Sequence, residues 1–214
     1  MKQVFPHWLE WAREIQALSQ SGRHYAQNDY DRQRYIRFEE LAAEIISTYT
    51  ALPQESVVEL YNHQVGYATP RVDVRGAVFN QGRILMVRER MDGRWTLPGG
   101  WADVGDVPSE AAEREVWEEA GMHVKAKKLI GVYDANRSGT LELFHAFKVI
   151  FLCELLNAEG ESFTPAYTSF ETSEVKFFAH EEIPTDLSSQ RTNPRYILDA
   201  YRAYQQPDTP TVFD

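Results

Sequence analysis

The 214-residue chain has a single cysteine and no long hydrophobic run. Cys153 has no disulfide partner within the chain, and because it lies in an apolar segment we expect a small buried side chain rather than a nucleophile. The longest apolar run, residues 149–156, is interrupted by Glu154 and is too short to span a bilayer. Glu10 and Glu14 lie where a signal peptide needs apolar residues, so we expect a cytoplasmic protein that does not contact a membrane.

Positive charge is also scarce. The chain has 22 Lys and Arg against 32 Asp and Glu, and its formal net charge at pH 7 is -10. Broad binding to a nucleic-acid backbone depends on basic surface that releases counterions, so nucleic acid is not an expected partner. A nucleotide is still possible as a ligand, because metal ions and a few basic residues can neutralise a pyrophosphate locally.

The hydrophobic pattern changes between residues 62 and 72. Before this boundary apolar residues recur at helical spacing, and we expect a small helical domain over residues 1–65 with a polar loop at residues 20–31. This domain has more large apolar side chains than about 65 residues bury easily, which predicts a homodimer. The large residues in question include Trp8, Trp11, Tyr35 and Phe38.

Residues 66–214 predict a second domain of mixed strands and helices. A turn at residues 80–82 separates two alternating segments and predicts a hairpin. The expected strands are residues 72–79, 84–90, 124–133, 143–156 and 175–178, and Asn193 is expected to begin a C-terminal helix.

Three carboxylates gather on one short helix of the second domain. Pro108 suits the first turn of this helix and Gly121 its left-handed C-terminal cap. Glu115, Glu118 and Glu119 follow the spacing i, i+3 and i+4, so they lie on one face. A lone glutamate run usually lines a solvated surface. Here the adjacent face is apolar, with Ala112, Val116 and Ala120. Hard oxygen ligands that border buried structure indicate a divalent-metal site.

The same segment resembles the Nudix box, which is Gly, five residues, Glu, seven residues, then Arg-Glu-aliphatic-x-Glu-Glu-x-Gly-aliphatic. The matching residues are Gly100, Arg114, Glu115, Val116, Glu118, Glu119, Gly121 and Met122. Asp106 stands where the family usually has Glu, which keeps the charge and shortens the side chain by one methylene. The resemblance implies an α+β fold, a Nudix α/β/α sandwich with a mixed sheet, preceded here by the small helical domain.

The resemblance also implies the roles of the box residues. Glu115 and Glu119 would be direct ligands of Mg²⁺ or Mn²⁺, Glu118 a ligand or a bridge between ions, and the carbonyl of Gly99 a further oxygen. Arg114 cannot bind a cation, so we expect it to pair with a neighbouring carboxylate and to orient the loop and the helix.

Three further stretches, residues 66–76, 95–105 and 171–178, resemble a bacterial Nudix subfamily with a helical N-terminal extension, similar to CDP-choline and ADP-ribose pyrophosphatases. This implies hydrolysis of the pyrophosphate bond in a nucleoside diphosphate linked to another moiety, with release of a nucleoside monophosphate. Two alternatives remain: an RNA-directed decapping or exonuclease activity, and a non-catalytic nucleotide sensor. The full set of box glutamates disfavours the sensor, and the acidic composition disfavours the RNA enzyme.

A general base is expected outside the box. Glu171 and Glu174 follow the long strand in sequence, in a region from which similar family members bring a carboxylate over the bound ions. We favour Glu171, because it precedes the strand and can close over a substrate. Both residues could also be ordinary exposed acids.

Four further residues are candidates for substrate binding. Arg88 and Arg90 precede the glycine turn and could reach phosphates, although a solvent-facing pair is an equally ordinary interpretation. Tyr133 and His145 lie in or next to predicted strands that could flank a base or a leaving group. Aromatic residues in strands are more often part of the core, and His145 could be a core histidine.

Overall fold

The computed structural model describes residues 6–138, 143–156 and 169–214. The chain divides into two compact units. One comprises Met1–Pro70 with Leu141–His145, and the other Arg71–Thr140 with Ala146–Asp214. Among the described residues, no helix combines the length and the apolar character needed to cross a membrane.

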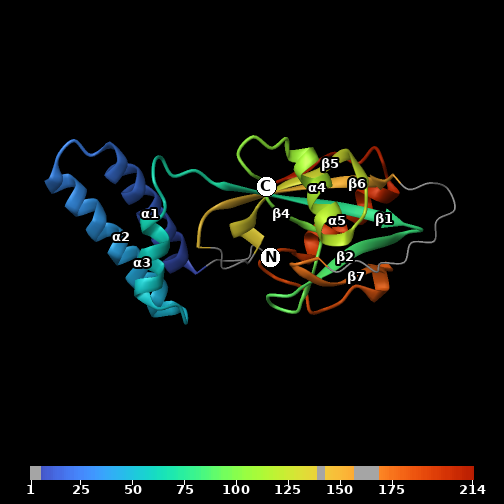
Figure 1. The fold of residues 1–214 in the computed structure, drawn as a ribbon, viewed down its shortest axis with the longest axis horizontal. Coiled ribbons are helices and arrows are strands. Elements are labelled where there is room, and N and C mark those ends of the chain that lie inside the picture. The colour runs from blue at the N-terminus through green and yellow to red at the C-terminus, as the bar shows by residue number, and fades with distance from the viewer. Residues whose placement is uncertain (1–5, 139–142, 157–168) are drawn as a thin grey trace. The chain divides into compact units, whose positions relative to one another are not determined.

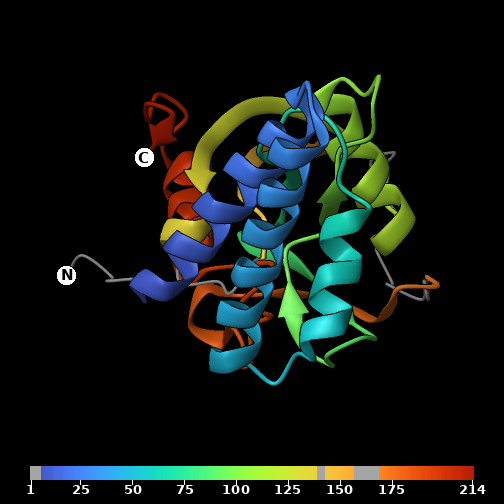
Figure 2. The ribbon, with the colours of Figure 1, turned by 90° about the vertical axis from the view of Figure 1, so that its left-hand side faces the viewer.

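The first unit is built from three helices, α1 (His7–Tyr25), α2 (Asp29–Tyr49) and α3 (Gln54–Asn62). The helices α1 and α2 lie side by side (Figure 2). Asn28 caps α2, because its side-chain oxygen accepts a hydrogen bond of 2.9 Å from the backbone N–H of Asp31. The core of this unit consists of Leu9, Ala12, Ala42, Ala43, Ile46, Val57 and Tyr61.

The first helix is longer than the sequence predicted. Instead of giving way to a loop at residues 20–31, α1 continues through Gly22 to Tyr25. A Cβ atom at Gly22 would lie 2.2 Å from Cε1 of Tyr35, so glycine makes room for the Tyr35 ring between α1 and α2. The predicted loop start was wrong because Gly22 serves helix packing and not chain reversal.

A single mixed sheet runs through the second unit, in the order β3-β2-β1-β6-β5-β8, with β4 paired to β1 and β7 to β2 (Figure 1). The long central strand β1 runs parallel to β6 and antiparallel to β2. The strands are β1 (Arg71–Asn80), β2 (Arg83–Glu89), β3 (Trp95–Thr96), β4 (Gly99–Trp101), β5 (Val124–Asp134), β6 (Ala146–Leu155), β7 (Thr172–Phe178) and β8 (Val212–Phe213).

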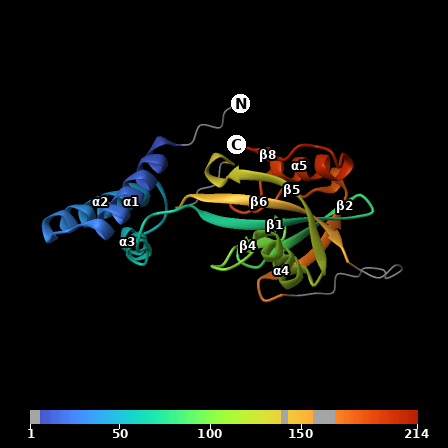
Figure 3. The same ribbon diagram turned by 90° about the horizontal axis from the view of Figure 1, so that it is seen from above.

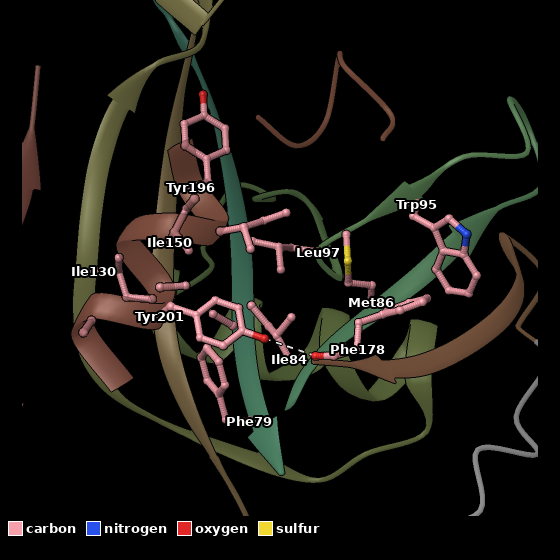
Figure 4. Packing of buried hydrophobic residues seen from close by; sticks show 14 of the residues in the cluster. Phe79, Ile84, Met86, Trp95, Leu97, Ile130, Ile150, Phe178, Tyr196 and Tyr201 are labelled. Atoms are coloured by element: carbon pink, nitrogen blue, oxygen red, sulfur yellow. Dashed lines mark hydrogen bonds between the residues drawn. The ribbon is translucent and has the colours of Figure 1, made fainter. Parts of the chain in front are cut away.

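Two helices cover this sheet from opposite sides, α4 (Pro108–Ala120) and α5 (Pro194–Gln205) (Figure 3). A large apolar cluster lies between the strands and α5, and in it the hydroxyl of Tyr201 donates a hydrogen bond of 3.1 Å to the carbonyl of Phe178 (Figure 4). A second cluster lies under α4 and contains Val116, Ala120 and Cys153. Cys153 is a buried free thiol, as predicted. The predicted helical region followed by a mixed α/β sheet is confirmed.

Several strand predictions differ from the structure, and β7 begins at Thr172 and not at residue 175. The strand β6 begins at Ala146 and not at Leu143, because Leu143 and Phe144 pack on the core of the helical unit. The ring of Phe144 lies edge-on to Tyr61 with 6.0 Å between the ring centres. The short strands β3, β4 and β8 were not predicted, since two or three residues carry no detectable periodicity.

Candidate active site

A glycine turn brings the backbone close to the acidic helix. Gly99 has a φ of +148°, and a Cβ atom there would lie 2.2 Å from the carbonyl oxygen of Val74. A Cβ atom at Gly100 would lie 2.9 Å from Oε2 of Glu115. Gly99 therefore requires glycine, and at Gly100 a side chain would press on the carboxylate of Glu115.

The helix α4 presents its three box glutamates in different environments. Glu115 and Glu119 are buried, with 9% and 4% of their surface exposed, whereas Glu118 is exposed. Glu119 Oε2 accepts a hydrogen bond of 3.0 Å from the backbone N–H of Gly99. Burial raises the pKa of Glu119 to about 8, although Arg75 and the Gly99 N–H act in the opposite direction. Burial also raises the pKa of Glu115, against the effect of Arg114.

Arg114 connects the loop to the helix. Its Nη1 donates to Glu115 Oε1 at 2.9 Å and to Glu118 Oε2 at 3.0 Å, and its Nη2 donates to Asp106 Oδ2 at 3.1 Å. Asp106 also accepts a hydrogen bond of 2.9 Å from the backbone N–H of Asp103. That bond, together with Arg114, lowers the pKa of Asp106. The aspartate thus reaches Arg114 despite the missing methylene.

The donor atoms at this site suit a divalent cation. Two buried carboxylates and a glycine carbonyl are hard oxygen donors, which Mg²⁺ and Mn²⁺ prefer. Gly100 also lets the backbone approach the Glu115 carboxylate closely, where a Cβ atom would lie 2.9 Å from Oε2. Within the described residues, no three Asp, Glu, His or Cys side chains lie close enough together to hold an ion. In this arrangement the guanidinium of Arg114 is the cation between Glu115 and Glu118.

Glu174 and Arg88, two predicted functional residues, form an ion pair with each other. The distance from Arg88 Nη1 to Glu174 Oε1 is 2.6 Å, and Arg88 Nε donates to the carbonyl of Gly93 at 2.7 Å. On β7 the next residue, Val175, packs in the cluster under α4. Because neighbouring side chains in a strand point to opposite faces, Glu174 points away from the box helix.

Glu171 is exposed and precedes β7 directly. Its backbone N–H donates to Ser169 Oγ at 3.1 Å, and its carbonyl accepts a hydrogen bond of 2.8 Å from the N–H of Arg90. The Arg90 side chain is exposed and donates to the carbonyl of Ser169 at 3.3 Å. Glu171 adjoins Thr172, which pairs with the buried Glu89 across β2 and β7.

Tyr133 lies inside the protein. Its hydroxyl donates a hydrogen bond of 3.1 Å to Asp199, and its ring packs against Tyr196 with 4.5 Å between the ring centres. None of its surface is exposed, which leaves no face for a substrate in this structure. For this reason the structure supports the alternative, that Tyr133 is a core residue, and not its predicted role in substrate binding. His145 is exposed and belongs to the helical unit.

Glu89 and Arg191 were missed by the sequence analysis. Glu89 ends β2 and is only 2% exposed, and burial raises its pKa. Arg191 Nε lies 3.0 Å from Glu89 Oε1, but that oxygen accepts no aligned hydrogen bond, so the contact is an ion pair only. Glu89 pairs with Thr172, whose hydroxyl donates to the carbonyl of Glu119 at 2.8 Å. The sequence signal that could have identified Glu89 was its charge just after the apolar segment 84–87.

The chain resembles known proteins over its whole length. Residues 69–200 match the NUDIX domain, and residues 6–61 match a domain described as "UDP-X-like, N-terminal oligomerisation domain". The chain is 34% identical over 215 residues to the Bacillus subtilis (strain 168) protein "Putative ADP-ribose pyrophosphatase YjhB", with 100% of both chains covered.

Two solved structures are similar to this one. An ADP-ribose pyrophosphatase from Streptococcus suis is 33% identical, with 68% of this chain and 100% of that chain covered and a TM-score of 0.59. A UDP-X diphosphatase is 28% identical, with 97% of this chain and 98% of that chain covered and a TM-score of 0.61. With the Nudix box folded as described above, the chain belongs to the Nudix family and is a Nudix pyrophosphohydrolase.

Proposed function

We propose that this enzyme hydrolyses the pyrophosphate bond of a nucleoside diphosphate linked to another moiety, with the help of Mg²⁺ or Mn²⁺, and releases a nucleoside monophosphate. The observation that carries the proposal is the meeting of the glycine turn with the acidic helix. There, the Gly99 N–H binds Glu119, and the backbone of Gly100 lies close to the Glu115 carboxylate with no side chain between them.

In this proposal Glu115, Glu119 and the carbonyl of Gly99 hold the metal, and Glu118 is a further ligand or a bridge between ions. A bound divalent ion neutralises phosphate charge and makes a water molecule more acidic. For Glu118 to take part, its carboxylate must exchange the hydrogen bond with Arg114 for the cation. Arg114 then keeps its bond to Asp106 and continues to hold the loop against the helix.

The reaction itself is an attack of water on one phosphorus atom. The new P–O bond forms as the bridging P–O bond breaks, and the bridging oxygen leaves with the other phosphate. Glu171 is our candidate for the base that accepts the proton of the water, since it is exposed and its neighbour Thr172 pairs with the buried Glu89. Glu174 is the weaker candidate, because Arg88 neutralises it on the opposite face of β7.

The substrate class follows from the relatives. An ADP-ribose pyrophosphatase and a UDP-X diphosphatase are both named for nucleoside diphosphate derivatives, and they resemble this chain over most of its length. We propose a substrate of the ADP-ribose, CDP-choline or UDP-sugar type.

We also propose that the enzyme is a homodimer formed through the helical unit. The match to an oligomerisation domain covers α1, α2 and nearly all of α3. Large apolar side chains on these helices face solvent, including Trp11, Leu18 and Phe38 with 58%, 64% and 47% of their surface exposed. Exposed apolar surface of this kind marks an interface between proteins.

A substrate screen tests the proposed activity. Nucleoside diphosphate derivatives are incubated with the enzyme and Mg²⁺ or Mn²⁺, and the release of nucleoside monophosphate is measured. Glu119→Gln serves as the inactive control and Glu110→Gln, on the exposed first turn of the same helix, as the active one. Cleavage of capped RNA with no cleavage of nucleoside diphosphate derivatives would overturn the proposal in favour of an RNA-directed enzyme.

A further inference from the structure

Three charged side chains form a cluster in the interior of the second unit. Asp73, Arg75 and Lys148 are 3%, 1% and 1% exposed. Arg75 Nε and Nη2 donate to the two carboxylate oxygens of Asp73, both at 2.9 Å, and Lys148 Nζ donates to Asp73 Oδ2 at 3.0 Å. Two cations share one carboxylate, so these three residues together carry one excess positive charge. A buried excess charge is costly unless it is balanced nearby.

The remaining nitrogen of Arg75 reaches the segment that leads into the glycine turn. Its Nη1 donates to the carbonyl of Leu97 at 2.7 Å and to the hydroxyl of Thr96 at 2.9 Å. The hydroxyl of Thr192 accepts a hydrogen bond of 3.0 Å from the N–H of Leu97 and lies 2.7 Å from the hydroxyl of Thr96. Every nitrogen of the Arg75 fork is therefore committed to Asp73 or to the two residues that precede Pro98.

The turn also rests directly on Arg75. Gly99 pairs with Arg75 across β1 and β4, and a Cβ atom at Gly99 would lie 2.5 Å from Cγ of Arg75. The backbone N–H of Gly99 binds Glu119, and the positive charge of Arg75 also acts on that carboxylate. The backbone that binds Glu119 thus rests on the Arg75 side chain of the buried, positively charged cluster.

We propose that Arg75 is a positioning residue of the active site: its guanidinium, held by Asp73, fixes residues 96–99 so that the Gly99 backbone and the Glu119 carboxylate are placed before a cation arrives. This inference rests on the proposed function only where it concerns the cation. The placement of Gly99 is a property of the protein alone. A lysine in place of Arg75 keeps the positive charge and loses the planar guanidinium. It therefore distinguishes the effect of the hydrogen bonds that position the turn from the effect of the charge.

The sequence offers a direct measurement of the turn, because Pro98-Gly99 is the only Pro-Gly pair among the 214 residues. Protein labelled with ¹³C at the proline carbonyl and ¹⁵N at glycine gives one amide signal in an experiment that correlates the two nuclei. That signal reports the hydrogen bond from Gly99 to Glu119, and Glu119→Gln must shift it. It is recorded without any metal, and Mn²⁺ affinity is then measured on the same samples.

We expect Arg75→Lys to shift the Gly99 signal and to weaken Mn²⁺ binding by about tenfold, the usual size of effect for residues that orient metal ligands. The matched control is Arg83→Lys, at an exposed ion pair with Glu182 at the start of β2, which should change neither. An unchanged Gly99 signal in folded Arg75→Lys would overturn the proposal. A shifted signal with unchanged Mn²⁺ affinity would overturn the inference that the position of the turn affects cation binding.

Thr192→Val keeps the test decisive if Arg75→Lys does not fold, because it removes the hydroxyl that holds Leu97 and introduces no charge. A shifted Gly99 signal with weaker Mn²⁺ binding supports the proposal, and an unchanged signal contradicts it. If the unsubstituted protein binds no Mn²⁺, the proposed metal dependence fails, while the Gly99 signal still decides the role of Arg75.

Discussion

The backbone N–H of Gly99 lies 3.0 Å from Oε2 of Glu119. This bond joins two segments that are 20 residues apart, the turn after β3 and the last turn of α4. It gives a buried carboxylate one donor and leaves its other oxygen for a further partner. The acidic helix and the glycine turn therefore act as one structural unit.

Glu115→Gln and Glu119→Gln should each lower turnover by roughly 100-fold or more, because they remove charge from the proposed metal site without changing its size. The fold should persist, since a glutamine side chain in place of Glu119 can still accept the hydrogen bond of Gly99 and carries no buried charge. Turnover at saturating Mg²⁺ and thermal unfolding measure the two effects. Glu110→Gln is the control, and near-normal turnover in Glu119→Gln would rule out the site.

Asp106 should act through Arg114. Asp106→Glu keeps the charge within reach of Arg114 and should retain activity, whereas Asp106→Ala should lower turnover by about tenfold, because Arg114 loses the contact that ties the loop to the helix. Steady-state kinetics of the three proteins checks this. Equal rates in all three would show that the position contributes nothing.

The pH dependence of turnover should identify the general base. If Glu171 accepts the proton of the attacking water, Glu171→Gln should lower turnover by about 10²–10⁴-fold and flatten the acidic limb, where protonation of the base normally stops the reaction. Glu174→Gln should remove the ion pair with Arg88 and leave the profile intact. The opposite pattern would assign the role to Glu174, and two unchanged profiles would exclude both residues.

Cys153 should resist thiol reagents in the folded enzyme. Burial raises the pKa of its thiol from 9.0 to about 12, so at pH 8 only about one molecule in 10⁴ carries the reactive thiolate. Alkylation with iodoacetamide, followed by mass spectrometry, should be slow in buffer and fast in denaturant. Rapid labelling of the folded protein would show that the strand β6 opens.

The helical unit should control assembly. Leu18→Asp places a charge on an exposed apolar surface of α1 and should convert a dimer into a monomer at micromolar concentration. Sedimentation velocity measures the change. Met91→Asp, at an 85% exposed residue of the second unit, is the matched control and should remain dimeric. A monomer in the unsubstituted protein would contradict the proposed homodimer.

Much of the second unit could be predicted from local sequence. Pro108 and Gly121 mark the ends of α4 because each acts on its own backbone, and the spacing of Glu115, Glu118 and Glu119 determines their common face. Local sequence patterns gave a wrong prediction where a residue contacts a partner that is distant in the chain. Gly22 resembles a loop residue in the sequence, yet it makes room for the ring of Tyr35 on another helix.

The sequence by itself therefore determined the family, the acidic helix and the glycine turn, since these depend on residues close together in the chain. Only the tertiary structure decided which charges meet. Asp73 and Arg75 lie in the buried part of the strand β1, and their partners Thr96, Leu97 and Lys148 are 21 to 75 residues away. Such contacts come from strand pairing and burial across the whole sheet, and burial is also what separates the environments of Glu118 and Glu119.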